Sequence, residues 1–192
     1  MEAINRIDST IVPVLNDNID TDQIIPARFL KQTSRDGFGE NLFRDWRFDD
    51  LGNQRDDFSL NQDRYKGRVL LAGDNFGCGS SREHAAWALY DYGFRAVIST
   101  SFADIFKNNA LNNGLLPIEI SEELHQKLKQ SVLADPNTTV EINLEEQVVT
   151  CIEITEKFEI NSFKKSCLIK GQDEFGFLVE LRNEIESFED ER

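Results

Sequence analysis

Residues 72–89 read AGDNFGCGSSREHAAWAL, and the rest of the chain is organised around this stretch. The apolar run at residues 68–72 leads into it and predicts a β-strand. Three glycines follow within a few positions, and they allow positive φ and a close approach of the backbone to a ligand. The order Ser-Ser-Arg-Glu then has the form of a capping box with Ser80 at the N-cap. We therefore predict a helix from Ser80 to about Tyr92, with Gly93 just beyond its end.

The predicted start of this helix has the chemistry of an anion site. Unpaired N–H groups and a partial positive charge favour carboxylate or phosphate there. Arg82 adds a fixed cation that can form a two-pronged contact with a carboxylate. Ser80 and Ser81 place two hydroxyl groups at the same point. The alternative is that Ser80 does nothing but cap the helix.

Composition narrows the possible functions of the chain. With 192 residues, 40% of them hydrophobic, it is large enough for one well-packed domain. A net charge of −14 argues against nucleic acid or an anionic membrane as the partner. An acidic protein that handles an anion needs a local positive pocket, part of which a second chain can supply.

The sequence also indicates where the protein works. No apolar run approaches the roughly 18 residues of a membrane-spanning helix, and the N-terminus has no signal or transit pattern. The cysteines at positions 78, 151 and 167 are odd in number and widely spread, with no zinc or iron–sulfur spacing. We expect a cytoplasmic protein with no disulfides and no metal bound by this chain.

Elsewhere, strands and helices alternate in a way that predicts an α/β fold with a mixed, largely parallel sheet. Asp20 or Thr21 is expected to cap a short helical turn that Pro26 interrupts, although turn chemistry alone also explains these residues. His125 is expected at the surface of its helix. The remaining expected elements are strands at 9–15, 96–99 and 115–120, helices at 102–112, 121–130, 163–170 and 174–188, a hairpin of 138–143 with 147–154, and a frayed tail at 189–192. An irregular aromatic-rich excursion at about 36–66 and a helical extension at about 160–192 complete a single domain.

Two stretches of the sequence resemble signatures of the aconitase family. Residues 77–86, GCGSSREHAA, are similar without a gap to the signature of its swivelling domain, and residues 18–26, NIDTDQIIP, resemble the second signature in the expected order. Residues 42–47, LFRDWR, look like a bacterial branch in which this domain is a separate small subunit. The resemblance implies the swivelling β/β/α fold of the aconitase C-terminal domain, with helices flanking the sheet.

The same resemblance implies a hydro-lyase that acts on a small diacid at a carbon next to a carboxylate. Ser80 matches the catalytic base, while Ser81 and Arg82 match residues that bind substrate. Thr21 and Asp22 match further substrate-site residues that organise the surroundings of the serine. A specificity loop, expected to read the variable group of the substrate, comprises Arg28, Phe29, Leu30 and Lys31 and runs to Gln32.

The family's [4Fe–4S] cluster is expected on a large partner subunit, because this chain lacks the cysteine arrangement and is too short for the cluster domains. Two other functions stay open. A related dehydratase would act on another hydroxyacid, and a non-catalytic regulatory module would bind an anion at the same helix start. Within the motif, His84 as a base for Ser80, or Cys78 as a nucleophile, would indicate different chemistry. The plainer interpretations are a bracing histidine and a cysteine that fills space.

Overall fold

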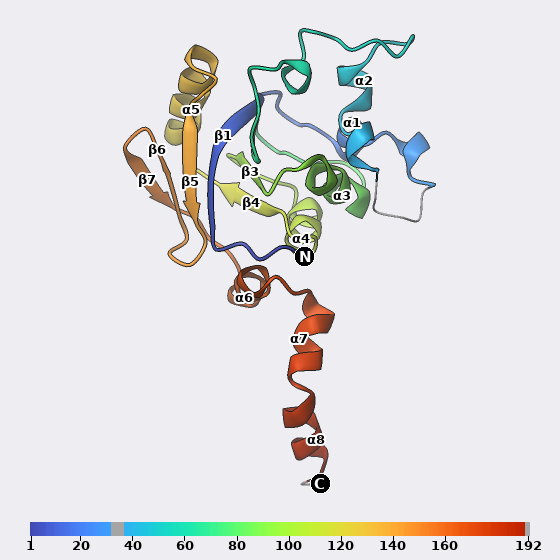
Figure 1. The fold of residues 1–192 in the computed structure, drawn as a ribbon, viewed down its shortest axis with the longest axis vertical. Helices are drawn as coiled ribbons and strands as arrows, with labels where there is room; N and C mark the ends of the chain where they lie inside the picture. The colour runs from blue at the N-terminus through green and yellow to red at the C-terminus, as the bar shows by residue number, and fades with distance from the viewer. Residues whose placement is uncertain (32–36, 191–192) are drawn as a thin grey trace.

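The computed structural model describes residues 1–31 and 37–190, so the predicted roles of Gln32, Asp36 and residues 191–192 lie outside the described residues. A seven-stranded sheet in the order β4-β3-β2-β1-β5-β6-β7 forms the body (Figure 1). Its strands are β1 (Arg6–Val14), β2 (Val69–Ala72), β3 (Ala96–Ser99), β4 (Leu116–Glu119), β5 (Thr139–Asn143), β6 (Val148–Cys151) and β7 (Ile154–Lys157).

The sheet has a parallel half and an antiparallel half, and β1 belongs to both. Strands β1 to β4 pair in parallel, whereas β1 with β5, β5 with β6 and β6 with β7 pair antiparallel. Strands β2 and β3 are buried along their whole length, as expected where helices cover a parallel sheet. The predicted mixed α/β fold is confirmed, and its antiparallel part was under-estimated. Strand β7 was not predicted because Ile152 and Glu153, with φ of 50° and 60°, make a tight turn without the usual turn residues.

Helices α3 (Glu83–Tyr92) and α4 (Asp104–Asn112) follow β2 and β3, and α5 (Glu122–Ala134) follows β4 (Figure 1). The Ser121 hydroxyl caps α5, as predicted. At the C-terminus, α6 (Ser162–Lys170) is followed by α7 (Glu174–Glu180) and α8 (Arg182–Asp190), which extend away from the body. The single helix expected over residues 174–188 is thus divided at Leu181, and helix continues to Asp190 where fraying was expected.

The described part of the aromatic-rich excursion has little regular structure. It contains only the short helices η2 (Gly39–Asn41), α2 (Arg44–Arg47) and η3 (Ser59–Asn61). Phe43 stacks on Trp46 with ring centroids 5.6 Å apart, and Phe58 packs edge-on against both rings. At Gly39 the excursion lies so close to the backbone of Tyr92 in α3 that a Cβ would clash. The excursion is therefore packed on the helix that carries the predicted site.

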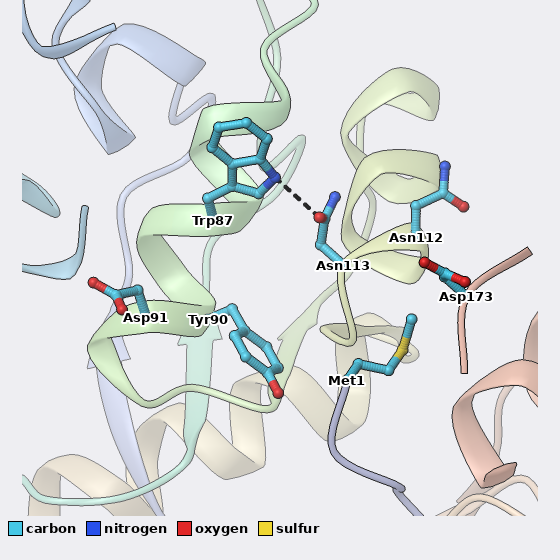
Figure 2. A pocket seen from close by; sticks show the side chains of 7 residues that line it. All are labelled: Met1, Trp87, Tyr90, Asp91, Asn112, Asn113 and Asp173. Atoms are coloured by element: carbon cyan, nitrogen blue, oxygen red, sulfur yellow. Dashed lines mark hydrogen bonds between the residues drawn. The ribbon is translucent and has the colours of Figure 1, made fainter. Parts of the chain in front are cut away.

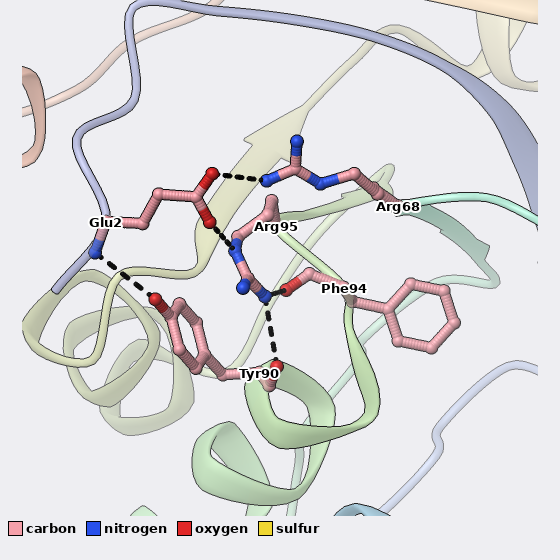
Figure 3. A network of polar contacts seen from close by, with 5 residues as sticks. All are labelled: Glu2, Arg68, Tyr90, Phe94 and Arg95. Carbon is pink, nitrogen blue, oxygen red and sulfur yellow. Dashed lines mark hydrogen bonds and ion pairs between the residues drawn. The ribbon is translucent and has the colours of Figure 1, made fainter.

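The N-terminal residues are clamped to the far end of α3 (Figure 3). The Glu2 carboxylate accepts from Arg68 at 2.9 Å and from Arg95 at 2.8 Å, and the Glu2 amide donates to the Tyr90 hydroxyl at 3.3 Å. The Arg95 guanidinium lies 3.9 Å from the centre of the Tyr90 ring. The hydrogen bond from Arg95, followed by that from Arg68, lowers the pKa of Glu2.

The prediction that His125 lies at the surface was wrong. The residue is only 5% exposed, and its Nε2 lies 2.7 Å from the carbonyl oxygen of Ala72 at the end of β2. Its Nδ1 is buried without a hydrogen-bond partner among the described residues. Helix α5 packs across β1, and this long-range contact, which no local pattern encodes, turns the ring inward.

Candidate functional site

The two signature segments meet because the strands before them are neighbours. Strands β1 and β2 pair in parallel up to Val14 opposite Ala72. Ligand sites in α/β sheets commonly form where such strands end, because the loops that leave their carboxyl ends share one edge. The segment of residues 18–22 leaves β1 there, and the segment of residues 74–82 leaves β2. Segments about 60 positions apart in sequence are thus brought side by side.

Backbone hydrogen bonds then join the two segments like a short parallel ladder. The Asn18 amide donates to the Asp74 carbonyl at 2.8 Å, and the Gly77 amide donates to the Ile19 carbonyl at 2.8 Å. The Thr21 amide donates to the Cys78 carbonyl at 3.0 Å. These hydrogen bonds fix the register of one segment relative to the other.

The short helix α1 (Thr21–Ile24) begins at this ladder. Asp20 is its N-cap and forms a full capping box with Gln23, which confirms the predicted cap. Thr21 is 2% exposed, and its hydroxyl donates to the carbonyl oxygen of Ser80 at 2.9 Å. Thr21 therefore fixes the backbone of Ser80, and its predicted role in the site stays a prediction.

The predicted capping box at Ser80 is absent from the structure. Helix α3 begins only at Glu83, and its N-cap is Arg82, which makes no side-chain capping bond. Gly77 and Gly79 have φ of +77° and +88°, so the backbone before the helix forms a turn and is not helical. The two serines thus lie in the loop just before the helix, and the interpretation of Ser80 as a simple cap is excluded.

Ser80 and Ser81 are both exposed, and neither hydroxyl has a hydrogen-bond partner within residues 1–31 and 37–190. They lie next to the positive end of α3, a helix of ten residues. Two exposed hydroxyls beside a helix N-terminus are placed to meet an anionic ligand that approaches from outside the chain.

Arg82 and Asp22 connect the segments at the outer end of the ladder. One terminal nitrogen of the guanidinium donates to the Asp22 carboxylate, which also accepts from the Ala27 amide at 3.2 Å. The Arg82 side chain is 15% exposed and that of Asp22 is 52% exposed. The hydrogen bond from Arg82 lowers the pKa of Asp22, so the carboxylate stays charged. Asp22 thereby orients the guanidinium, whose other two nitrogens have no hydrogen-bond partner within residues 1–31 and 37–190.

The predicted specificity loop follows α1 and is held by a residue that the sequence did not reveal. Within η1 (Ala27–Phe29), Arg28 donates from both terminal nitrogens to Asp45 in α2 and lies 4.7 Å from the centre of the Phe29 ring. This pairing lowers the pKa of Asp45. The Arg28 guanidinium is thus paired with the aromatic-rich excursion through Asp45. No local signal marks Asp45, because the pairing depends on how the excursion folds back.

The other three loop residues differ in their surroundings. Phe29 and Leu30 are half-buried and pack against the core, whereas Lys31 is exposed. Arg28, the other cation of this loop, is exposed as well, but its guanidinium is paired with Asp45.

Two alternative chemistries within the motif find no support. The His84 ring packs against Trp87 and Phe38, with centroids 4.6 Å and 5.4 Å away. Burial raises the pKa of the Cys78 thiol, and its sulfur donates to the Asn18 carbonyl at 3.4 Å. A reactive thiolate is disfavoured there, and the histidine acts as a packing residue.

A cavity of about 280 Å³ lies on another side of α3 (Figure 2). Its lining residues are Met1, Trp87, Tyr90, Asp91, Asn112, Asn113 and Asp173. The polar groups shown there already have partners: the Trp87 indole donates to Asn113 at 2.9 Å, and Asp91 accepts from the Gly39 amide at 2.8 Å. The cavity does not include Ser80 or Ser81, which are exposed.

The cysteines do not fit an iron–sulfur cluster. Cys78 lies in the signature loop, Cys151 in β6 and Cys167 in α6, and Cys151 donates to the Thr139 carbonyl at 3.1 Å. Across the described residues, no group of three His, Cys, Asp or Glu side chains is placed to hold a metal ion. No helix in the described ranges is long and apolar enough to cross a membrane.

Comparison with known proteins identifies the family. The sequence profile of the aconitase C-terminal domain matches residues 1–123, which is more than half of the chain. The chain belongs to the aconitase C-terminal domain family. Among other members, the 3-isopropylmalate dehydratase small subunit of Christiangramia forsetii is 55% identical, over 100% of this chain and 95% of that protein. That of Anaeromyxobacter dehalogenans is 52% identical over 98% of each.

A solved structure from the same family supports the fold. The crystal structure of a 3-isopropylmalate dehydratase from Methanocaldococcus jannaschii superposes with a TM-score of 0.67 at 30% identity, covering 96% of this chain and 99% of that one. The family resemblance and the expected swivelling-domain fold are thus confirmed.

Proposed function

We propose that this chain is the small subunit of a 3-isopropylmalate dehydratase. In leucine biosynthesis, such an enzyme interconverts 2-isopropylmalate and 3-isopropylmalate by removing and re-adding water through an unsaturated diacid. The observation that carries the proposal is the full-length match to small subunits named for this activity, at up to 55% identity. The intact pairing of the two signature segments supports it.

In this proposal, Ser80 is the base that removes the C–H proton next to the substrate carboxylate. A serine hydroxyl titrates far above neutral pH, so it needs dense positive potential to act as a base. Ser80 lies two residues before Arg82, the N-cap of α3, and the Thr21 hydroxyl donates to its carbonyl oxygen. In this proposal, the helix N-terminus and the guanidinium supply positive potential from this chain. Its free hydroxyl can turn toward the substrate because it is not used as a helix cap.

Arg82 binds a substrate carboxylate in the same proposal, and Ser81 adds a hydroxyl contact. Asp22 occupies one nitrogen of the guanidinium and leaves a planar fork of donors for the ligand. Asp22 and Thr21 thus serve the site by holding Arg82 and Ser80. Lys31, Leu30 and Phe29 are the loop residues that we assign to reading the substrate's side group.

The second half of the active site is proposed to come from a large subunit that bears a [4Fe–4S] cluster. This chain's own cysteines do not fit the cluster, and its serines face outward. Departure of the hydroxyl group is therefore assigned to the partner. The partner would also supply positive charge that a chain of net charge −14 lacks. We place the complex in the cytoplasm and treat the whole small subunit as one swivelling domain.

Co-expression with candidate large subunits tests this function. The complex should interconvert the two isopropylmalates, whereas either subunit alone should be inactive. A panel of 2-hydroxy diacids separates this activity from related dehydratases of the homoaconitase, methylmalate or dimethylmalate type. A complex that assembles but acts on none of them would favour the anion-binding regulatory module and contradict the proposal.

A further inference from the structure

Asn18 and Asn75 face each other across the two signature segments, at the inner end of their ladder. Both residues adopt left-handed backbone conformations, with φ of 56° and 52°. Glycine and asparagine tolerate this region, and most other residues do not. The Asn75 side-chain amide donates to the Asn18 side-chain oxygen at 2.9 Å. A side-chain hydrogen bond thus joins the two turns at which the segments leave the sheet.

Each asparagine is also fixed by its backbone. The Asn75 backbone amide donates to the hydroxyl of Ser101, in the loop after β3, at 3.0 Å. That hydroxyl donates to the Asp74 carboxylate at 2.6 Å, and this bond lowers the pKa of Asp74. The Asn18 amide donates to the Asp74 carbonyl at 2.8 Å. The pair therefore lies where three loops converge.

The other end of the ladder carries the proposed chemistry. There, Thr21 holds the carbonyl of Ser80, and Asp22 holds Arg82. The segments between the two ends are joined by single backbone hydrogen bonds. Ser80 and Arg82 belong to the same segment, so a shift at the asparagine end would move both of them relative to the Thr21 and Asp22 side chains that hold them. The backbone ladder transmits such a shift because it fixes the register of the two segments.

We propose that Asn18 and Asn75 are positioning residues for the dehydratase site. Their side-chain hydrogen bond sets the register of the two signature segments and with it the placement of Ser80 and Arg82. They touch neither the proposed base nor its carboxylate-binding arginine. The proposal rests on the proposed function for its catalytic consequence, but not for its structural one.

Glycine substitutions separate the side-chain bond from the backbone conformation. Asn75→Gly and Asn18→Gly keep the left-handed turns and remove the bond. In the assembled enzyme, each should lower kcat about 10- to 100-fold, the range that small misplacements produce, with a much smaller change in KM. Because the two residues act through one bond, the double variant should be no worse than the poorer single variant.

Two further variants sharpen the kinetic test. Asn75→Asp should retain more activity than Asn75→Gly, because the Asn18 amide can turn its NH₂ group toward the new carboxylate. Glu153→Gly is the matched control, since Glu153 is exposed at φ of 60° in the β6–β7 turn, away from the signature segments. Its kcat should equal that of the wild type. Unchanged kcat in both asparagine-to-glycine variants, or losses that simply multiply in the double variant, would overturn the proposal.

A chemical measurement tests the same bond without any reaction. The Cys78 thiol donates to the Asn18 carbonyl and is partly exposed, whereas Cys151 and Cys167 are buried. In the full chain alone, Asn75→Gly should speed the alkylation of Cys78 by iodoacetamide several-fold, and leave the buried cysteines protected. An unchanged rate at Cys78 would contradict the positioning role. If the wild-type complex proves inactive on isopropylmalate, the proposed function fails, and the alkylation rates alone decide this inference.

Discussion

Replacing Gly77 by alanine should destabilise the protein through two separable effects. Gly77 has φ of +77°, and a left-handed alanine costs about 1–2 kcal/mol. A Cβ at this position would also lie 2.2 Å from Cγ of Phe106 and clash with it. Phe106 belongs to α4, is 1% exposed and packs on Phe76 with ring centroids 5.1 Å apart. Such overpacking of a core costs about 1–3 kcal/mol. The total is about 2–5 kcal/mol.

Gly52→Ala is the matched control, because Gly52 has φ of +84° and nothing within 4 Å of its would-be Cβ. This variant has the cost of a left-handed alanine but no steric clash of the added Cβ. The difference between the two variants is therefore about 1–3 kcal/mol. For a chain of this size it corresponds to about 2–12 °C in Tm, at roughly 2–4 °C for each kcal/mol. Thermal unfolding followed by circular dichroism measures it, and equal Tm values for the two variants would refute the argument that Phe106 fixes the loop.

Three further predictions concern the proposed site and the N-terminal clamp. In the assembled enzyme, Ser80→Ala should lower kcat about 10²- to 10⁴-fold, the contribution of a general base, without loss of subunit association in gel filtration; near-normal turnover would exclude the serine as base. Arg82→Lys should lower kcat/KM about 10- to 100-fold, since one charged hydrogen bond is worth about 1.5–3 kcal/mol, and steady-state kinetics would expose an unaffected variant. Because Arg95 and Arg68 lower the pKa of Glu2, its carboxylate stabilises the fold above its ordinary pKa and loses this effect as pH falls through the lowered value. Glu2→Gln should thus cost up to about 1 kcal/mol near pH 7 and nothing well below pH 4, by urea unfolding at both pH values; a cost that is independent of pH would contradict the clamp.

The elements that the sequence predicted well have strong local signals. The cap of α1 at Asp20 needs only residues three positions apart, and it forms as expected. The end of α3 is marked by Gly93, which takes φ of +118° and accepts the left-handed turn that closes the helix. Strand β3 has the predicted bounds because it is a short apolar run between turns. In each case the residues that give the signal lie within a few positions of one another in the sequence.

The start of α3 shows where local signals fail. The order from Ser80 to Glu83 satisfies the capping-box pattern, yet the N-cap is Arg82, two residues later than the pattern predicts. The Thr21 hydroxyl donates to the Ser80 carbonyl oxygen, and the Asp22 carboxylate accepts from the Arg82 guanidinium. These partners come from a segment about 60 residues earlier, so no window around the motif contains them. This later helix start also leaves both serine hydroxyls without a hydrogen-bond partner in the part of the chain that the structure describes, as the proposed chemistry requires.

The meeting of the two signatures follows from sheet topology and not from either motif alone. Because β1 and β2 are parallel neighbours in register at Val14 and Ala72, both segments emerge at one edge. An antiparallel pairing of these strands would have placed the segments at opposite ends of the sheet. In our proposal, the hydrogen bond between Asn18 and Asn75 then sets the register of the two segments. That register brings Ser80 to Thr21 and Arg82 to Asp22. The geometry of the proposed site therefore depends on a strand pairing, two left-handed asparagines and one buried threonine, and all of these contacts lie within this chain.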